Sequence, residues 1–195
     1  MPSPPPRRAN PLTVEGIVDA ACRVVARDGL GNLSMRKLGA ELGADPMAVY
    51  HHVPSKRELL ALVTARTLGR MPPPDESAPW PDRVREWATR YWELVVANRE
   101  LTLAGLGDPA IAVGGLPSTE PLVAAIAASG LSADLVEPNA FVVVDVVHGS
   151  ALAVGSPGRE HRDLAPLRAA FEVGLDTIVA GIAVRVSGPP QPAGS

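Results

Sequence analysis

Apolar side chains recur three or four positions apart along most of the 195-residue chain. Within the segment 13–27 they fall on one helical face: Val14, Ile17, Val18, Ala21 and Val25. Thr13 can cap this helix and Gly29 can end it. The apolar run over 142–147 has strand propensity, but its length and its flanks favour a helix. The pattern therefore predicts an all-α protein.

Two short helices joined by a glycine follow the first helix. A helix capped by Ser34 extends to about Leu42, Gly43 makes the turn, and a short helix covers 46–51. Pro46 is tolerated in the first turn of that helix because the N–H group that it lacks would have no partner there. This arrangement is typical of a helix-turn-helix, whose second helix enters the major groove of DNA.

A fourth helix begins at a capping box. Ser55 stands three positions before Glu58, so the serine can cap the helix while the glutamate reaches back to the cap. This helix extends to about Arg70. Lys56 lies at its start, where the helix dipole and free N–H groups favour a phosphate.

The short helix offers an outward face that suits DNA. Val49 and Val53 can point inward, and the other side chains are small, apolar, imidazole or phenol groups that can contact thymine methyl groups, base acceptors or phosphates. The helix contains no arginine or asparagine for a bidentate base contact, so the operator sequence stays open. The predicted DNA-contacting residues are Ser34, Arg36, Lys37, Pro46, Met47, Ala48, Tyr50, His51, His52 and Lys56.

Charge is divided unevenly along the chain. Residues 1–70 carry ten Lys/Arg and six Asp/Glu, a net of +4, whereas residues 71–195 carry eight and fifteen, a net of −7. A basic segment on an acidic body is typical of a two-part DNA-binding protein, although many globular domains have a similar asymmetry.

A resemblance to a known family is carried by LSMRKLGAELGADPMAVYHHVPSKRELL. This stretch resembles the DNA-binding region of the tetracycline-repressor (TetR) family of bacterial transcriptional regulators, and the match covers about residues 12–70. Tyr50, His52, Val53 and Lys56 stand at positions of the family's pattern. The segment VYHHVPSKRELL is closer to the tetracycline-repressor subgroup, and NAFVVVDVVHGSALAVG and FEVGLDTIVAGI resemble the two long helices of that subgroup's C-terminal domain.

The resemblance implies a homodimer on a palindromic operator, a ligand pocket in the C-terminal domain and release from double-stranded DNA when a small molecule binds. Repression is the family's usual mode. The fourth helix would link the ligand site to the DNA-binding head, so that its displacement would alter the spacing of the two heads.

Aromatic residues gather on a helix that begins near Pro81. Each could be a core residue, which is the simpler interpretation, or part of the wall of an apolar ligand pocket. In the apolar helix over 134–155, Asp145 and His148 are polar exceptions that could bond each other, bond a ligand or face water. The predicted pocket residues are Trp87, Tyr91, Trp92, Val147 and His148.

The last helix, over about 165–186, repeats small residues on one stripe that includes two glycines. A glycine inside a helix costs about 1 kcal/mol relative to alanine, which suggests that another helix approaches closely there. We expect this helix and the 134–155 helix to pair with their copies in a four-helix dimer interface; burial within one subunit is the alternative. The predicted interface residues are Phe141, Val144, Ala151, Ala170, Phe171, Gly174, Thr177, Ile178 and Gly181.

Proline and glycine divide the chain into units. The predicted units are a disordered arm with Arg7 and Arg8 over 1–11, a helix-turn-helix domain over 12–57, a connecting helix with a ligand-binding and dimerisation domain over 58–187, and a disordered tail over 188–195. We expect a linker over 72–81, a long loop or irregular stretch over 105–118 and a further break over 155–158.

Several classes of protein find no support in the sequence. It has no Gly-rich phosphate loop, GxSxG motif, HExxH motif or Cys/His metal spacing, so we predict no enzyme, cofactor or metal site. Neighbouring histidines at 51 and 52 point about 100° apart on a helix, which does not suit one shared ion. The single Cys22 excludes an internal disulfide and fits a reducing cytoplasm. No uncharged apolar run of about 18 residues indicates a membrane helix.

The sequence thus predicts an all-α, ligand-responsive transcriptional repressor with a small apolar or aromatic effector. The alternatives are a helical ligand- or protein-binding module without DNA binding and, with less support, a helical enzyme. The sequence does not identify the effector, the operator, the target genes or the direction of regulation, nor whether His148 and Asp145 contact the ligand.

Overall fold

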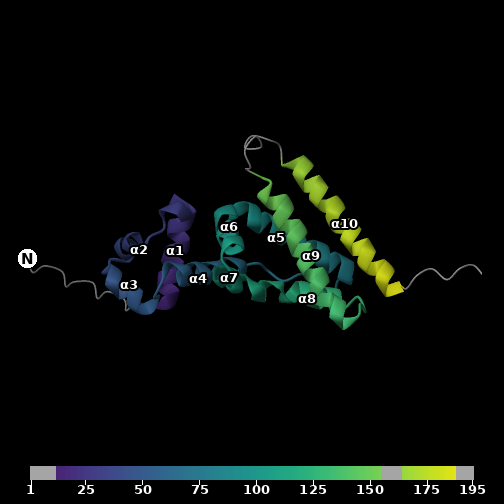
Figure 1. The fold of residues 1–195 in the computed structure, drawn as a ribbon, viewed down its shortest axis with the longest axis horizontal. Helices are drawn as coiled ribbons and strands as arrows, with labels where there is room; N and C mark the ends of the chain where they lie inside the picture. The colour runs from purple at the N-terminus through teal and green to yellow at the C-terminus, as the bar shows by residue number, and fades with distance from the viewer. Residues whose placement is uncertain (1–11, 155–163, 188–195) are drawn as a thin grey trace, which may run out of the picture.

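The computed structural model describes residues 12–154 and 164–187. Over these residues the chain is helical and contains no strand, as predicted (Figure 1). A small head of α1, α2 and α3 lies at one end, and α4 leads from it to a body built from the remaining helices (Figure 1). The predicted arm over 1–11, the break over 155–158 and the tail over 188–195 lie outside the described residues.

The head consists of α1 (Val14–Asp28), a 3-10 turn η1 (Leu30–Asn32), α2 (Met35–Leu42) and α3 (Pro46–His52), followed by α4 (Lys56–Leu68). The body consists of α5 (Trp80–Ala97), α6 (Arg99–Gly107), α7 (Pro109–Ala112), the 3-10 helix η2 (Val113–Thr119), α8 (Glu120–Ala127), α9 (Ala133–Leu152) and α10 (Ala165–Ser187).

Side-chain caps begin the helices of the head. The Thr13 hydroxyl accepts a hydrogen bond from the Gly16 N–H at 3.1 Å, and the Ser34 hydroxyl accepts one from Lys37 at 3.2 Å. The Ser55 hydroxyl accepts from the Glu58 N–H at 3.1 Å, which is the first half of the predicted capping box. Each cap satisfies a backbone donor that has no partner within its own helix.

Two hydrophobic cores hold the molecule together. The body core centres on α5, α8, α9 and α10, with Trp87 and Phe171 among its largest buried side chains. The head core gathers the buried faces of α1–α4 and also takes in Leu101 from α6 and Ile111 from α7. The head is therefore packed against the body through apolar contacts, rather than tethered to it by a bare linker.

The segment 105–118 is helical, so the prediction of a long loop there is wrong. Helix α6 continues to Gly107, and α7 and η2 follow with a break only around Asp108. A β-carbon on Gly114 would collide with the Ala61 carbonyl oxygen of α4, and one on Gly115 would come within 2.8 Å of Leu68. Gly114 and Gly115 thus allow close packing of η2 on α4, whereas the sequence pattern suggested that the glycines of this segment break helices.

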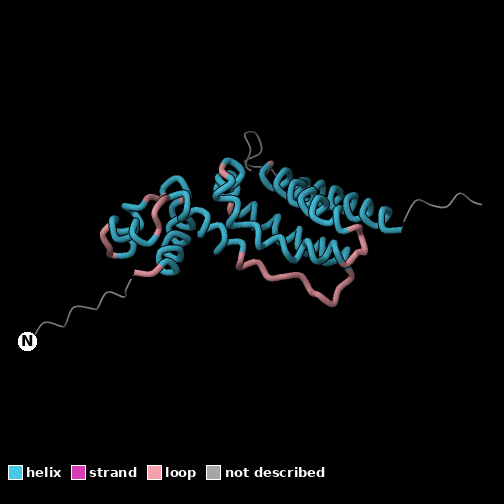
Figure 2. The backbone as a smooth tube through the Cα atoms, turned by 60° about the horizontal axis from the view of Figure 1, so that its bottom comes forward, coloured by secondary structure: helices cyan, strands magenta, loops and turns pink. Residues whose placement is uncertain are grey.

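The predicted linker lies over 69–79, the long pink segment of Figure 2, and α5 begins one residue earlier than expected. Arg90 of α5 donates hydrogen bonds to the carbonyl oxygens of Pro72 and Pro73 at 3.1 and 2.7 Å. Glu86 accepts another from the Asp75 N–H at 3.0 Å. These contacts hold the segment along α5, so the linker between α4 and α5 packs against the body.

Two stretches, Pro109–Ala127 and Ala133–Leu152, are long and apolar enough to cross a membrane by length and composition alone. The first comprises α7, η2 and α8 and is not one continuous helix. The second is α9, which packs against α5, α8 and α10. A core helix of a soluble protein meets the same criterion, so this observation is weak evidence for a membrane.

The contact between η2 and α4 makes a stability prediction. Gly114→Ala should lower the free energy of unfolding by about 1–3 kcal/mol because the new methyl group overpacks a backbone contact. Gly107→Ala is the matched control, since a β-carbon there meets nothing within 4 Å. Urea unfolding of both variants checks this, and equal stability of the two would contradict the close contact.

Candidate DNA-binding surface and ligand pocket

Helix α3 presents an outward face at the end of the head. Val49 and Val53 are fully buried, whereas Met47 and Tyr50 are 63% and 41% exposed. The side chains of His51 and His52 are exposed as well, and Pro46 and Ala48 are half-buried at the rim of the same face. The structure thus leaves the sequence-predicted residues of this helix at least partly exposed, while Val49 is buried in the head core.

The angle between α2 and α3 depends on a close backbone approach. A β-carbon on Gly39 would lie 2.8 Å from the Ala44 carbonyl oxygen and 3.2 Å from the Pro46 nitrogen. The Asp45 carboxylate caps α3 by accepting a hydrogen bond from the Met47 N–H at 2.7 Å. Sequence reasoning missed this cap, although an aspartate directly before a proline at the start of a helix is a recognisable signal.

The basic residues of the head divide into free and paired cations. Arg36 and Lys56 are exposed and form no ion pair within the described part of the chain, so both can meet phosphates. Lys37, by contrast, lies 2.9 Å from Asp28. Hydrogen bonds from Arg27 and Lys37 hold the pKa of Asp28 below its usual value. A phosphate would therefore have to compete with Asp28 for Lys37. Ser34 is exposed, and its hydroxyl serves as the α2 cap.

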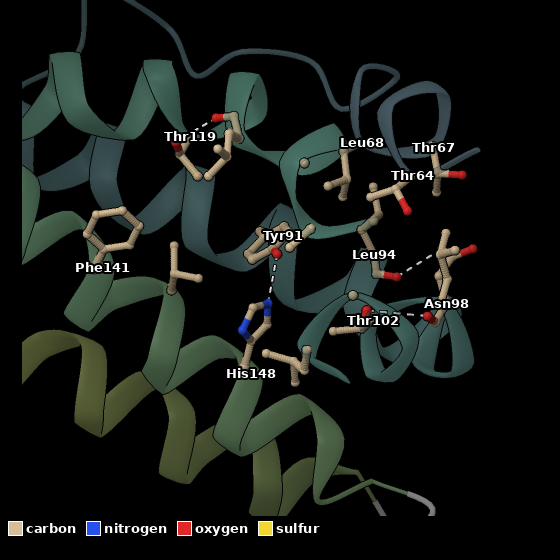
Figure 3. A pocket seen from close by; sticks show the side chains of 17 residues that line it. Thr64, Thr67, Leu68, Tyr91, Leu94, Asn98, Thr102, Thr119, Phe141 and His148 are labelled. Carbon is tan, nitrogen blue, oxygen red and sulfur yellow. Dashed lines mark hydrogen bonds between the residues drawn. The ribbon is translucent and has the colours of Figure 1, made fainter. Parts of the chain in front are cut away.

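A cavity of about 150 Å³ lies in the body where α4, α5, α6, η2 and α9 meet (Figure 3). Its lining is mostly apolar, and its polar groups are neutral: threonines, one asparagine, Tyr91 and His148. No Asp, Glu, Lys or Arg side chain lines it. The lining residues are Thr64, Thr67, Leu68, Tyr91, Leu94, Asn98, Leu101, Thr102, Gly105, Leu106, Ala112, Gly115, Leu116, Thr119, Phe141, Val144 and His148.

Tyr91 and His148 share a hydrogen bond on the pocket wall. The Tyr91 hydroxyl and His148 Nε2 lie 2.8 Å apart, and Figure 3 shows the two side chains meeting from opposite helices. Burial raises the pKa of Tyr91 to about 12. Burial lowers the pKa of His148, and the exposed Asp145 only partly opposes this effect. Both rings are therefore neutral near neutral pH.

Only two of the five predicted pocket residues lie on the pocket wall, namely Tyr91 and His148. Trp87 is fully buried and donates its indole N–H to the Ser118 carbonyl oxygen at 2.9 Å. Trp92 stacks on Phe171 with ring centroids 5.9 Å apart, and Val147 is fully buried. These three residues are core residues, which corrects their assignment to the pocket.

The residues of α4, α6 and η2 that line the pocket were not predicted. Thr64, Leu68 and Leu106 sit at ordinary helical positions, and nothing in their local sequence marks a cavity. Their presence means that the same helix that leaves the head also forms part of the pocket wall.

Polar contacts also join the head to the body, in addition to the apolar contacts of Leu101 and Ile111 with the head core. Arg57 at the start of α4 donates two hydrogen bonds to Asp108, at 2.6 Å from Nε and 2.5 Å from Nη2. Asp108 also caps α7 through the Ala110 N–H at 3.0 Å. Glu100 of α6 accepts a hydrogen bond from the Leu30 N–H of η1 at 2.8 Å. Movement of α6 or α7 therefore acts directly on the head.

The residues predicted for a dimer interface do not share one face. Ala170, Thr177 and Gly181 lie exposed along α10. Ala151 and Phe171 are instead buried within the chain, which corrects their assignment to the dimer interface.

The other predicted interface residues also have contacts within the chain. Phe141 and Val144 line the pocket, and Ile178 packs against the body core. Gly174 faces Val146 of α9, since a β-carbon there would lie 3.5 Å from that side chain.

Within the described residues, no group of three His, Cys, Asp or Glu side chains could hold a metal ion. The head presents a cationic, partly apolar surface, and the body contains a neutral, mostly apolar pocket. This arrangement suits binding of a polyanion at one end and of an uncharged small molecule at the other.

Comparisons with known proteins identify relatives of the head and of most of the chain. The family model described as bacterial regulatory proteins, tetR family, matches residues 17–63. An HTH-type transcriptional regulator of Saccharopolyspora erythraea is 31% identical over 166 residues, which make up 82% of this chain and 67% of that protein.

Solved structures resemble nearly the whole chain. BioQ with its natural double-stranded DNA operator is 26% identical with a TM-score of 0.70, over 88% of this chain and 98% of that one. ActR of Streptomyces coelicolor in complex with actinorhodin is 25% identical with a TM-score of 0.72, over 89% and 97% of the two chains.

The environment of His148 makes a pH prediction. Because the folded state lowers its pKa from the usual value of about 6.5, protonation favours the unfolded chain. The stabilisation is complete above that value and is lost as the pH falls through it toward the folded pKa. When the pH is lowered from about 7.5 to about 5.5, the free energy of unfolding of His148→Gln should therefore fall less than that of the wild type. Urea denaturation at both pH values checks this, and identical losses would contradict the burial of a neutral imidazole.

Proposed function

This chain belongs to the TetR family of bacterial regulatory proteins, and we propose that it represses transcription by binding a palindromic operator as a dimer. The observation that carries the proposal is the exposed α3 surface, together with Arg36 in the first turn of α2 and Lys56 at the start of α4, which form no ion pair within the described residues. Small and aromatic side chains on that face suit base edges and thymine methyl groups, and the two cations suit the flanking phosphates. BioQ, a relative by sequence and fold, binds its own operator DNA.

Release from DNA would follow occupation of the pocket by a small uncharged molecule. A cavity of about 150 Å³ holds no more than about one benzene ring, whereas drug-sized ligands occupy about 300 Å³ or more. A larger effector must therefore push the walls apart, and those walls include α4, α6 and η2. Binding energy spent on this displacement would favour a head position that differs from the DNA-bound one.

The effector class follows from the lining of the pocket. With both Tyr91 and His148 neutral and no charged side chain on the wall, an ionic ligand would lose its hydration without gaining a partner. An apolar or aromatic molecule with a few hydroxyl or carbonyl groups could instead bond to the threonines, Asn98 and the Tyr91–His148 pair. The relative ActR binds actinorhodin.

The dimer would form through the exposed face of α10. Ala170, Val173, Thr177 and Gly181 lie on one helical stripe, and Val173 is 68% exposed. Small side chains there allow a second α10 to approach closely, with the exposed outer face of α9 beside it. A large apolar stripe on a soluble monomer is otherwise unusual.

The remaining assignments follow the family. We propose that the chain works in the cytoplasm, where its operator lies, and that it has no catalytic role or cofactor. The proposed units are a DNA-binding head over 12–57 and a connecting helix with a ligand-binding and dimerisation body over 58–187.

The DNA-binding surface is tested by fluorescence anisotropy with the DNA that flanks the chain's own gene. Arg36→Ala and Lys56→Ala should each weaken binding, and each should reduce the slope of log K against log salt by about 0.9 for every phosphate that the head no longer neutralises. Arg85→Ala in α5 is the control, since Arg85 pairs with Asp82 and Asp176 on the body. No binding by the wild type at low salt would rule out the proposed function.

The α10 face is tested by sedimentation. The wild type should sediment as a dimer at micromolar concentration, and Thr177→Arg should shift it toward monomer because two guanidinium groups would meet across the axis. Ala124→Arg, on the exposed side of α8, should leave the dimer intact. A monomeric wild type, or a dimer that tolerates Thr177→Arg, would place the interface elsewhere.

A further inference from the structure

A second cavity, of about 530 Å³, lies between the head and the body. Its walls come from α1 and η1 on the head side, from α4, and from the junction of α5 and α6 on the body side, elements that adjoin in Figure 1. Its volume falls within the range of about 300–1,000 Å³ that small-molecule sites occupy. The proposed regulatory mechanism makes no use of this cavity, which we call the junction cleft.

The junction cleft combines apolar walls with two arginine side chains. Val25, Leu30 and Val63 are among its apolar lining residues, and Arg70 and Arg99 also line it. This composition differs from that of the pocket in the body, which has no charged side chain.

Neither arginine is neutralised by a close partner. Arg70 lies 3.8 Å from Asp19, but Asp19 is already bound at 2.8 Å by Arg66. Arg99 forms no ion pair within the described residues, and its Nε is buried with no hydrogen-bond partner. A buried N–H without a partner is costly, so a ligand whose acceptor reached this group when the side chain adjusts would gain affinity.

The geometry points to a second effector site in the junction cleft for a small amphipathic organic acid. The carboxylate or sulfonate group would lie between Arg70 and Arg99, and the apolar part of the ligand would lie against the valine and leucine side chains. Planar guanidinium groups suit such oxyanions because they can donate two parallel hydrogen bonds.

Such a ligand would act on the position of the head through Glu100. The Glu100 carboxylate, another lining residue, accepts the hydrogen bond from the Leu30 N–H that ties α6 to the head. An anion bound beside Arg99 would repel this carboxylate and weaken the tie. The cleft also shares Thr67, Leu94, Asn98 and Leu101 with the first pocket, so occupation of either cavity should change affinity at the other.

The test uses two fluorescent probes that differ only by an acidic group. Anilinonaphthalene sulfonate carries the sulfonate, and N-phenylnaphthylamine has the same rings without it. In the dimeric full-length protein, Arg99→Gln and Arg70→Gln should each weaken sulfonate binding about tenfold, the loss expected for one charge-assisted hydrogen bond. Neither variant should change the affinity for the uncharged probe.

Two further measurements place the probe in the cleft. Glu100→Gln keeps an acceptor for the Leu30 N–H but removes the negative charge, so it should strengthen sulfonate binding. Cys22, the single cysteine, lines the junction cleft and not the first pocket. The sulfonate probe should therefore slow the alkylation of Cys22 in the wild type. For each variant, the alkylation rate is measured with and without the probe. Circular dichroism melting checks that the variants fold.

The outcomes separate this site from the proposed function. Equal sulfonate affinity in wild type and both arginine variants, equal response of the two probes, or undiminished Cys22 alkylation would each overturn the second site. Because a bound anion would weaken the Glu100–Leu30 contact, the sulfonate should also weaken operator binding. This expectation rests on the proposed function, and a wild type that binds no DNA would defeat that function alone. The probe titrations and the alkylation rates need no DNA.

Discussion

Helix α4 belongs to two packed regions at once, and the rest of the structure depends on this constraint. Leu59 and Val63 are buried in the head core, while Leu68 packs against the body core. Between them, η2 lies so close to Ala61 that only glycine fits opposite. Packed interiors are stiff and have few alternative arrangements. In the proposed mechanism, a change in the pocket would therefore be transmitted along α4 to the head.

The head could be predicted almost to the residue because its signals are local. Caps at Thr13, Ser34 and Ser55 and a turn at Gly43 act on the residues beside them, and the structure confirms each helix boundary to within one or two residues. The segment 105–118 was misjudged for the opposite reason. Gly114 and Gly115 pack against α4, which lies about fifty positions away in the sequence. The local sequence pattern does not show so distant a partner.

The pocket and the dimer face show the same limit. Aromatic residues on α5 were conspicuous, yet only Tyr91 reaches the cavity, while Trp87 and Trp92 fill the core. Periodicity locates an apolar face but does not say which neighbour covers it. On α10, residues on both sides are apolar, so Phe171 and Ala170 were assigned alike although one is buried and the other exposed.

The stripe of small residues on α10 also bears on which chains can assemble together. In the dimer proposed through α10, close contact across Ala170, Thr177 and Gly181 would require that both partners be small at facing positions. A related regulator in the same cell that carries a leucine or phenylalanine at one of these sites would clash at the axis, and its subunits would be excluded from mixed dimers. In the proposed dimer the stripe would thereby separate this regulator from its relatives, since no hybrid dimer would combine the operator preference of one chain with the effector of another.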